Sequence, residues 1–533
     1  MDILMIAFGA MIGWGWVVST GDWIGTAGVI GAMLGFILGG VMIFFIGMTY
    51  AELTPAMPEC GGEHVFSMRA MGPVGSFICT WAIILGYVSV VCFEACALPT
   101  IITYVWPQFL QGYLYTVAGF DIYATWLATA IVFAVFIAVI NIMGAKTAAK
   151  LQNILTLAIG AAGILLIAAS VITGDPSNLE GQMFAGNGME GMMGTIIKVA
   201  AVSPFFFIGF DVIPQAAEEI NVPLKKIGKI LMLSIILGVG FYALIIFSVG
   251  YVMNGDQIAA SYDGTGLVTA DAMANAFHSK IMAKVLILAG MCGIITSWNS
   301  FMIGGSRAMY SMAESYMIPR FFGKLHPKTN TPYVSILVVG LLSVLAPFAG
   351  RKMLVWIVDA GNFGCILAYC MVSLSFIILH VKEPTMPRPY KVKHWKFIGA
   401  MAVLMSAIMI MLYILPGTGV TLAPQEWAMV AGWSLFGVVF FAFSKLVYKD
   451  KFGYYAQLAV GENETAEQGD ETAATVRASS VVMAAESSAP DEWTHGFDYF
   501  LPINLVFGQG KVEQVGKLAS AHGSTAMIVT GGN

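Results

Sequence analysis

Two stretches of unusual sequence decide the fold: GAMIGWGW at residues 9–16 and SPFFFIGFDVIP at residues 203–214. Each lies inside a long apolar run of the kind that normally forms one continuous helix. Glycine costs about 1 kcal/mol relative to alanine in a helix interior, and proline removes a backbone donor and clashes with the preceding turn. We therefore expect both runs to lose their α-helical hydrogen bonds at these points.

The composition around these stretches is that of a membrane protein. Charged residues are 11% of the 533 and apolar residues 58%, whereas about 25% of an ordinary soluble protein is charged. A spanning helix needs roughly 20 mostly apolar residues. Twelve such runs lie near 3–20, 28–50, 73–104, 122–142, 151–173, 195–217, 229–253, 281–306, 332–349, 354–380, 397–416 and 426–447. The expected fold is an all-α membrane protein with twelve transmembrane helices.

The basic residues orient these runs, because cytoplasmic loops are rich in Lys and Arg. With the N-terminus inside, the outer loops hold only five of the 26 basic residues: Lys198, Lys280, Lys284, Arg351 and Lys352. We therefore expect a multi-pass protein of the cytoplasmic (inner) membrane with both termini in the cytoplasm. No cleavable leader is visible, and the abrupt apolar start suggests a very short cytoplasmic tail or a clipped reading frame.

The two interrupted runs are the first and the sixth, an arrangement typical of an inverted repeat with its binding site at the midplane of the membrane. The outer half of the first helix would direct free amides to the midplane, and the outer half of the sixth would direct free carbonyls there. Amides favour a carboxylate and carbonyls favour an ammonium group, so the site would suit a zwitterion. The alternative is that these small residues only permit close helix packing.

At these residues the chain resembles the amino acid–polyamine–organocation transporter superfamily. Further matching motifs are YAEL at 50–53 with Pro58, Gly61, Gly62 and Glu63; Glu218, Glu219, Asn221 and Pro223; and Gly305, Ser306, Arg307, Tyr310, Met312, Ala313, Pro319, Thr331 and Pro332. The resemblance implies a five-plus-five inverted repeat with two additional helices, working by alternating access.

The resemblance also implies a substrate site. The substrate carboxylate would meet the backbone around Trp14 and Gly15, and the amine would meet the carbonyls of Met11, Phe205 and Ile208. Phe205 would act as an aromatic lid. The predicted substrate-binding residues are Met11, Trp14, Gly15, Glu94, Phe205, Ile208 and Gly209. Trp14 departs from the family, which usually has a small residue there, so its indole would either shrink the pocket or turn away.

Ionisable residues inside apolar runs are costly and mark functional sites. Glu94 lies where relatives line the substrate side-chain pocket, and we hypothesise that it faces an amine-bearing substrate group; a hydrogen-bonded acid between helices is the alternative. Asp211 is predicted to link the broken helices, to join a proton relay, or only to start a helix. Glu52 is predicted to pair with basic residues of inner loops as a gate or a brace, and Asp359 is given no role.

No resident cofactor or metal is predicted, since the seven cysteines form no paired CxxC motif or Cys/His cluster. A coupling ion, Na⁺ or H⁺, is expected. Sodium-coupled transporters of this fold use two carbonyls of the first helix with a carbonyl and two hydroxyls of the eighth, and Gly293, Thr296 and Ser297 repeat that spacing opposite Gly9 and Ile12. Simple helix packing by Thr and Ser is the alternative. Sodium coupling, proton coupling and exchange all stay open.

The sequence changes character after the expected transporter domain, residues 1–451. Residues 452–492 are acidic and predicted to be a disordered linker. Residues 493–533 are predicted to be a short α/β segment, and FDYFLPINLVFGQGKVEQVGKL and MIVTGGN within them resemble the opening of an iron-dependent alcohol dehydrogenase. The remainder of such an enzyme is missing, so we expect a remnant of gene fusion or a frame error without catalysis.

These features predict a secondary transporter for an amino acid or small amine and not an enzyme. Its expected partners are the small-molecule substrate and the lipid bilayer, with no nucleic acid. The absence of a GxxxxGK[ST] loop argues against an ATP-driven pump. A transporter-like receptor that binds without transport is the alternative, and a membrane-tethered dehydrogenase would lack its iron ligands.

Overall fold

The computed structural model describes residues 2–117, 119–219, 222–418 and 420–454. The predicted dehydrogenase-like segment, and the predicted linker apart from its first residues, lie outside the described residues. So does Asn221 of the family motif.

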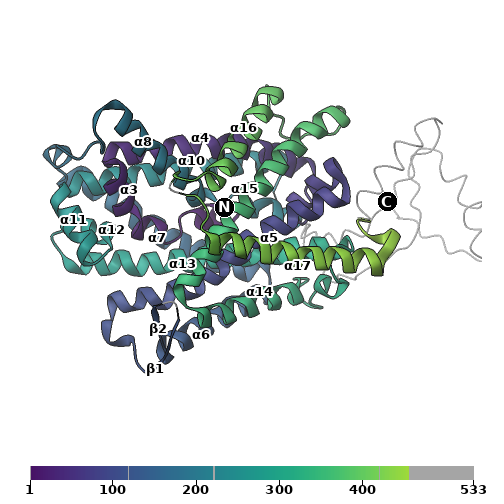
Figure 1. Ribbon diagram of the computed structural model, residues 1–533, viewed down its shortest axis with the longest axis horizontal. Coiled ribbons are helices and arrows are strands. Elements are labelled where there is room, and N and C mark those ends of the chain that lie inside the picture. Colours follow the sequence, from purple (N-terminus) through teal and green to yellow (C-terminus); the bar gives the residue numbers. More distant parts are fainter. Residues whose placement is uncertain (1, 118, 220–221, 419, 455–533) are drawn as a thin grey trace, which may run out of the picture. The chain divides into compact units, whose positions relative to one another are not determined.

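Long apolar helices make up most of this part of the chain (Figure 1). They are α4 (Val29–Ala56), α5 (Glu63–Val105), α6 (Ala124–Ile142), α7 (Ala145–Thr173), α8 (Gly188–Val202), α10 (Leu224–Val252), α13 (Lys280–Glu314), α14 (Tyr333–Leu345), α15 (Gly350–Lys382), α16 (Trp395–Ile414) and α17 (Pro424–Tyr448). Within the described residues, ten helical segments are long and apolar enough to cross a membrane, and a bent pair at the start of the chain brings the number to eleven. Each of the twelve predicted runs coincides with helical structure, and the ninth forms the shorter α14 followed by the 3-10 turn η6 (Ala346–Ala349).

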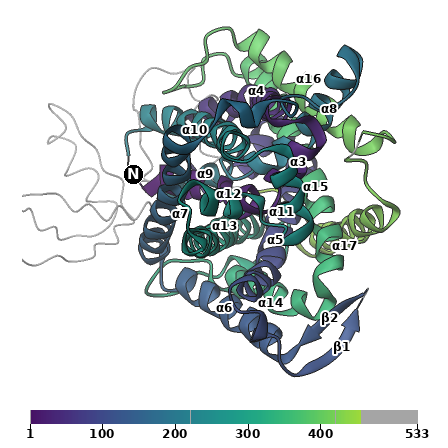
Figure 2. The same cartoon turned by 90° about the vertical axis from the view of Figure 1, so that its left-hand side faces the viewer.

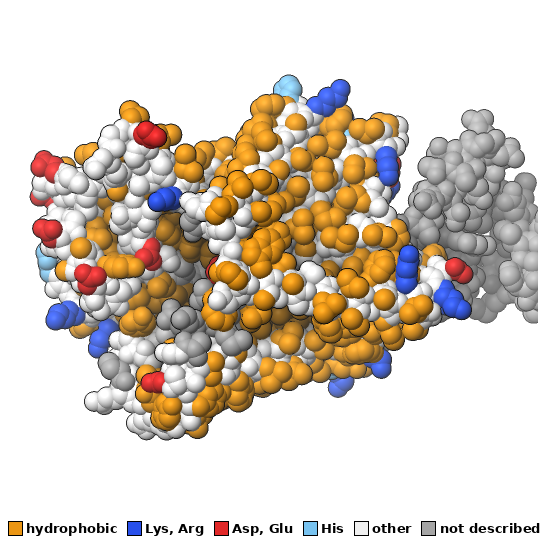
Figure 3. All heavy atoms as spheres, in the orientation of Figure 1, with side chains coloured by type: hydrophobic (Ala, Val, Ile, Leu, Met, Phe, Trp, Pro, Cys, Tyr) orange, Lys and Arg blue, Asp and Glu red, His pale blue; other side chains and the backbone are white. Residues whose placement is uncertain are grey.

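The helices form one bundle with an apolar surface. Viewed along the helices, α4, α10 and α16 lie on one side and α6 and α14 on the other, with α5, α13 and α15 between them (Figure 2). Large apolar side chains point outward, for example Val132 at 63% exposed and Leu446 at 75%. Charged side chains instead gather at the two ends of the bundle (Figure 3). This distribution fits a bundle whose sides face lipid and whose ends face water, and the chain is a multi-pass membrane protein.

Two features between the long helices were not expected. The strands β1 (Tyr113–Val117) and β2 (Phe120–Tyr123) form an antiparallel hairpin in which Val117 pairs with Phe120, so the prediction of purely helical structure is wrong at this point. Alternating aromatic and β-branched residues favour strands, and Gly119 takes the positive φ of 80° that the tight turn requires. Two short helices, α11 (Gly255–Gly264) and α12 (Val268–Ala276), fill the connection between α10 and α13.

The first predicted run is interrupted in the structure. It forms α1 (Asp2–Met11), α2 (Gly15–Val18) and α3 (Thr20–Ala27), with residues 12–14 outside any α-helix. A second irregularity follows at Ser19, where the segments Ile3–Val18 and Thr20–Ala27 are bent by 66°. Gly13 within the gap and Gly15 at its end account for the loss of helix at residues 12–14.

The sixth run is interrupted as well. After α8 the chain tightens into the 3-10 turn η3 (Ser203–Phe207), which begins with Pro204 in its first turn, and resumes as α9 (Val212–Gln215). Between these elements Ile208 is extended, with φ −62° and ψ 134°, and Gly209 has φ 133°. Both predicted interruptions are therefore present.

Candidate functional site

The two interruptions pack directly against each other. A Cβ atom on Gly209 would lie 2.6 Å from the Cβ of Ala10 and 3.2 Å from the amide nitrogen of Met11. The ring of Phe206 covers Gly15 in the same way, since a Cβ there would lie 2.5 Å from Phe206 Cε1. Only glycine permits such close approach of backbone to its neighbours, so the glycines bring the breaks side by side.

The breaks leave backbone donors and acceptors close together. The amides of Gly13 and Trp14 and the carbonyl of Ile208 have no hydrogen-bond partner among the described residues. The Met11 carbonyl accepts a hydrogen bond of 2.7 Å from the Tyr242 hydroxyl, and the Phe205 carbonyl accepts one of 3.2 Å from the Ile208 amide. A carbonyl oxygen has two lone pairs, so both of these carbonyls keep acceptor capacity.

A cavity of about 290 Å³ lies at the breaks. Six of the seven predicted substrate-binding residues line it: Met11, Trp14, Gly15, Glu94, Phe205 and Ile208. The seventh, Gly209, packs behind the wall on Ala10. The rest of the lining is mostly apolar and aromatic, and the volume is at the lower end of small-molecule sites. The role of the seven predicted residues in substrate binding stays a prediction.

The bulk of Trp14 is accommodated by α13. Its indole occupies the space where a side chain of Gly290 would otherwise lie, and Trp14 is 8% exposed. The departure from the family therefore turns most of the ring toward α13, and the cavity next to it is kept. Gly290 was not singled out from the sequence, because its pairing with Trp14 exists only in the fold.

Glu94 of α5 is buried in the cavity wall. Its side chain is 6% exposed, and its Oε2 atom makes no hydrogen bond with the described protein. The hydroxyl groups of Ser297 and Tyr242 are its polar neighbours. A buried carboxylate oxygen without a hydrogen-bond partner costs free energy. A cationic ligand bound next to Glu94 would remove this cost.

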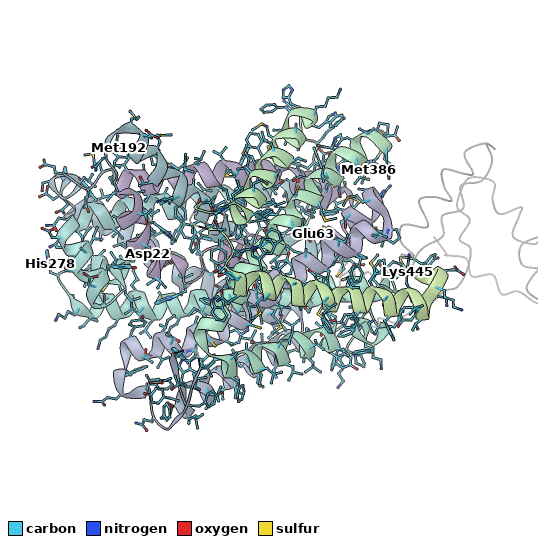
Figure 4. All side chains as sticks on the ribbon, in the orientation of Figure 1. Asp22, Glu63, Met192, His278, Met386 and Lys445 are labelled. Atoms are coloured by element: carbon cyan, nitrogen blue, oxygen red, sulfur yellow. The ribbon has the colours of Figure 1, made fainter. Side chains whose placement is uncertain are left out.

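Asp211 is fully buried and fixes the second break. Its Oδ1 accepts a hydrogen bond of 2.8 Å from the Gly209 amide, and its Oδ2 accepts one of 2.8 Å from the hydroxyl of Tyr87 on α5. Next to it the fully buried Glu63 bonds the side-chain amide of Gln215. Figure 4 shows Glu63 inside the bundle, with Asp22 toward one end and Lys445 toward the other. The sequence drew attention to Glu63 only as part of a motif.

Glu52 forms a buried ionic cluster at the end of α4. Its Oε1 lies 2.8 Å from Arg388 Nε and 3.1 Å from His380 Nε2, and its Oε2 accepts a hydrogen bond of 2.6 Å from the Val392 amide. Arg388 belongs to the connection between α15 and α16, so the cluster ties α4 to α15 and to that connection.

An aromatic layer separates the cavity from the Glu52 cluster. Tyr50 makes ring contacts with Phe66, Phe210 and Tyr369, and all four side chains are fully buried. Along α15, Asp359 lines the cavity, Tyr369 belongs to the layer and His380 to the cluster. At a rise of 1.5 Å per residue, each of these positions is about 15 Å from the next along α15. The layer and the cluster therefore close one side of the cavity.

The candidate cation site is built from oxygen atoms only. The Thr296 hydroxyl lies 3.0 Å from the Gly9 carbonyl and 2.9 Å from the Gly293 carbonyl. Ser297 lies against Gly13, next to the fully buried Ile12. In the part of the chain that is described, no group of three His, Cys, Asp or Glu residues could hold a metal ion. Such an oxygen set suits a hard monovalent cation better than a transition metal.

A buried amide network lies beside this candidate cation site. Asn299 of α13 donates to Gln152 of α7 at 2.9 Å, and Asn141 of α6 donates to Asn299 at 2.9 Å. Thr156 and Gln152 of α7 in turn contact Gly9 and the carbonyl of Met5. Sequence reasoning missed this network, because its members come from three separate helices.

A bundle of membrane-spanning helices around a small central cavity, with two interrupted helices at its wall, defines a membrane transporter and not an enzyme. The family model described as amino acid permease matches residues 1–441. The chain belongs to this amino acid permease family, as its resemblance to the wider transporter superfamily predicted.

Individual relatives agree on the class and differ in substrate. The chain is 26% identical to the branched-chain amino acid permease BcaP of Bacillus subtilis, with 77% of this chain and 86% of the relative covered. It is 25% identical to the aspartate-proton symporter of the same organism, with 77% and 78% covered. It is 26% identical to the cationic amino acid transporter 4 of Mus musculus, with 73% and 60% covered. The names of these relatives include amino acids of different charge. Family membership therefore indicates amino acid transport but does not define the side chain of the substrate.

Proposed function

We propose that the chain is a secondary transporter that carries an amino acid or small amine across the cytoplasmic membrane by alternating access. The observation that carries this proposal is the close packing of the two breaks beside one cavity, with free amides on the first helix and a free carbonyl on the sixth. In the proposed architecture, twelve spanning helices form a five-plus-five inverted repeat, and the two breaks lie at the membrane midplane. The transporter domain, residues 1–451, is sufficient for this activity.

In the proposed complex, the substrate carboxylate accepts hydrogen bonds from the amides around Trp14 and Gly15. The ammonium group lies between the carbonyls of Met11, Phe205 and Ile208, and Glu94 provides a charged partner for an amine-bearing substrate. Phe205 is half-buried at the cavity and stacks edge-on with Phe206 at 4.9 Å between ring centres. These aromatic rings exclude water from the bound substrate.

The closed side of the cavity supports the proposal of alternating access. With both termini in the cytoplasm, as the distribution of Lys and Arg supports, the aromatic layer and the Glu52 cluster lie on the cytoplasmic side. The structure then corresponds to a state closed toward the cytoplasm. Opening requires the separation of Glu52 from Arg388 and of Tyr50 from Phe210, while Asp211 keeps Gly209 in place.

The candidate cation site provides a route for coupling. A sodium ion held by the carbonyls of Gly9, Ile12 and Gly293 and the hydroxyls of Thr296 and Ser297 would join the first helix to α13. Its binding would stabilise the gap at residues 12–14, which borders the substrate site, so that ion and substrate would favour the same conformation.

The test uses purified protein in liposomes. Counterflow of radiolabelled amino acids and amines is expected, and binding without counterflow would instead indicate a receptor. Glu94→Gln should weaken binding of amine-bearing substrates about 10- to 100-fold, because hydrogen bonds to charged groups contribute about 1.5–3 kcal/mol. Glu190→Gln, a matched change at an exposed position in the first turn of α8, serves as the control. Unchanged uptake of every cationic substrate by Glu94→Gln would refute the role of Glu94.

A further inference from the structure

A second carboxylate, that of Asp359, lines the same cavity as Glu94. Asp359 lies on α15, which packs along α5, the helix that carries Glu94. Its neighbour Val358 lines the cavity as well, so this face of α15 forms one wall. No role was predicted for Asp359 from the sequence, because nothing local shows that α15 faces the two breaks.

Both carboxylates face the cavity without a cationic partner among the described side chains. The lining contains no described Lys, Arg or His, and Glu94 and Asp359 are its only charged residues. Tyr242 and Ser297 are the groups that face Glu94. When these two groups are ionised, they give the cavity a negative potential that favours a cationic ligand.

The two carboxylates serve different ends of the cavity. Glu94 lies near Tyr242, whose hydroxyl binds the Met11 carbonyl at the break. Asp359 lies near Tyr413 of α16 and Glu426 of α17. The Glu426 carboxylate accepts a hydrogen bond of 2.7 Å from the Ala423 amide, where it caps the start of α17. The side chains of Asp359 and Glu426 also hydrogen-bond each other, and of this pair it is Asp359 that lines the cavity.

We propose that the substrate carries two cationic groups, one held at the helix breaks beside Glu94 and the other held by Asp359. This inference rests on the proposed transport function and narrows its substrate class to a small diamine or a dibasic amino acid. A singly charged amine pairs with only one of the two carboxylates and leaves the other, either the buried Glu94 or the half-buried Asp359, without a cation. A dication neutralises both carboxylates. The cavity volume of about 290 Å³ suits molecules of this size.

The experiment measures thermal stabilisation and counterflow of the full chain with matched pairs of probes. Diamines from 1,2-diaminoethane to 1,6-diaminohexane are compared with monoamines of the same length, and lysine is compared with norleucine. Wild-type protein should bind the best dication about tenfold or more tightly than its singly charged match, because one charged hydrogen bond is added. Preference for lysine over the diamines would assign a dibasic amino acid, and the reverse would assign a diamine.

Asp359→Asn should abolish the preference for the dication and keep the affinity for the singly charged probe. Asp256→Asn, at an exposed position in the first turn of α11, is the matched control and should behave like wild type. Asp359→Glu, which keeps the charge, should retain part of the preference and shift it toward a different chain length. Equal binding of dication and monoamine by wild type, or an unchanged preference in folded Asp359→Asn, would overturn this inference while transport stands. Loss of the proposed transport function would show itself differently, as no counterflow of any probe.

Discussion

Gly209→Ala tests whether the packing of the two breaks forms the substrate site. Gly209 has φ 133°, a region that side chains rarely adopt, and a Cβ atom there would lie 2.6 Å from the Cβ of Ala10. Carbon atoms attract best at about 3.5–4.0 Å, so the breaks must move apart by about 1 Å. The next atoms are backbone, the Ala10 carbonyl carbon and the Met11 amide nitrogen, both at 3.2 Å. No side-chain rotation can relieve this contact.

The expected loss follows from the strain. A side chain in a sparsely populated backbone conformation costs about 1–3 kcal/mol. This strain destabilises the packed arrangement of the breaks relative to arrangements in which they lie apart. A ligand that binds only the packed arrangement loses the same free energy of binding. We expect binding about 5- to 150-fold weaker than in wild type.

Thermal-shift titration with a bound amine and counterflow in liposomes measure this effect. Gly240→Ala is the matched control: Gly240 lies within α10, no atom lies within 4 Å of its Cβ position, and alanine there favours the helix by about 1 kcal/mol. Size-exclusion chromatography shows that both variants fold. Wild-type affinity and counterflow in a monodisperse Gly209→Ala protein would refute the reasoning.

Two further predictions concern the closed side and the coupling ion. Glu52→Gln leaves Arg388 without its buried anion, at a cost of about 3–5 kcal/mol. This change should speed maleimide labelling of the buried Cys60, measured in a protein whose other cysteines are replaced by serine. An unchanged labelling rate would exclude a gating role for Glu52. Thr296→Val keeps the shape and removes the hydroxyl near the Gly9 carbonyl, so uptake driven by an imposed sodium gradient should be lost while the protein stays folded. Wild-type uptake that follows only a pH gradient would contradict the sodium site.

The interruptions in the first and sixth helices could be predicted because their cause is local. Glycine and proline weaken a helix wherever the chain runs, and the gaps at residues 12–14 and 208–211 lie within the stretches that the sequence singled out. The same holds for the start of the third run, near residue 73. Gly72, with φ 76° and ψ −173°, breaks the long helix α5 at that point.

Features that depend on packing between distant helices could not be predicted. Asp359 reaches the cavity only because α15 packs along α5, and Gly290 makes room for Trp14 only because α13 lies against the first break. The basic partner of Glu52 was expected on an inner loop. Which residue it is, Arg388, depends on how the connection between α15 and α16 folds. The hairpin at residues 113–123 was not predicted, although its alternating aromatic residues are a local signal of strands.

Tyr87 and Glu94 are seven residues apart on α5, which is two helical turns, so they lie on the same face of one rod. Tyr87 binds Asp211, which holds the amide of Gly209, while Glu94 lies at the cavity. If a cation binds at Glu94 as proposed, a tilt of α5 that follows would act on the sixth helix through Tyr87 and Asp211. On the proposed function, substrate binding and the first movement of the sixth helix would thus be coupled through a single helix, α5.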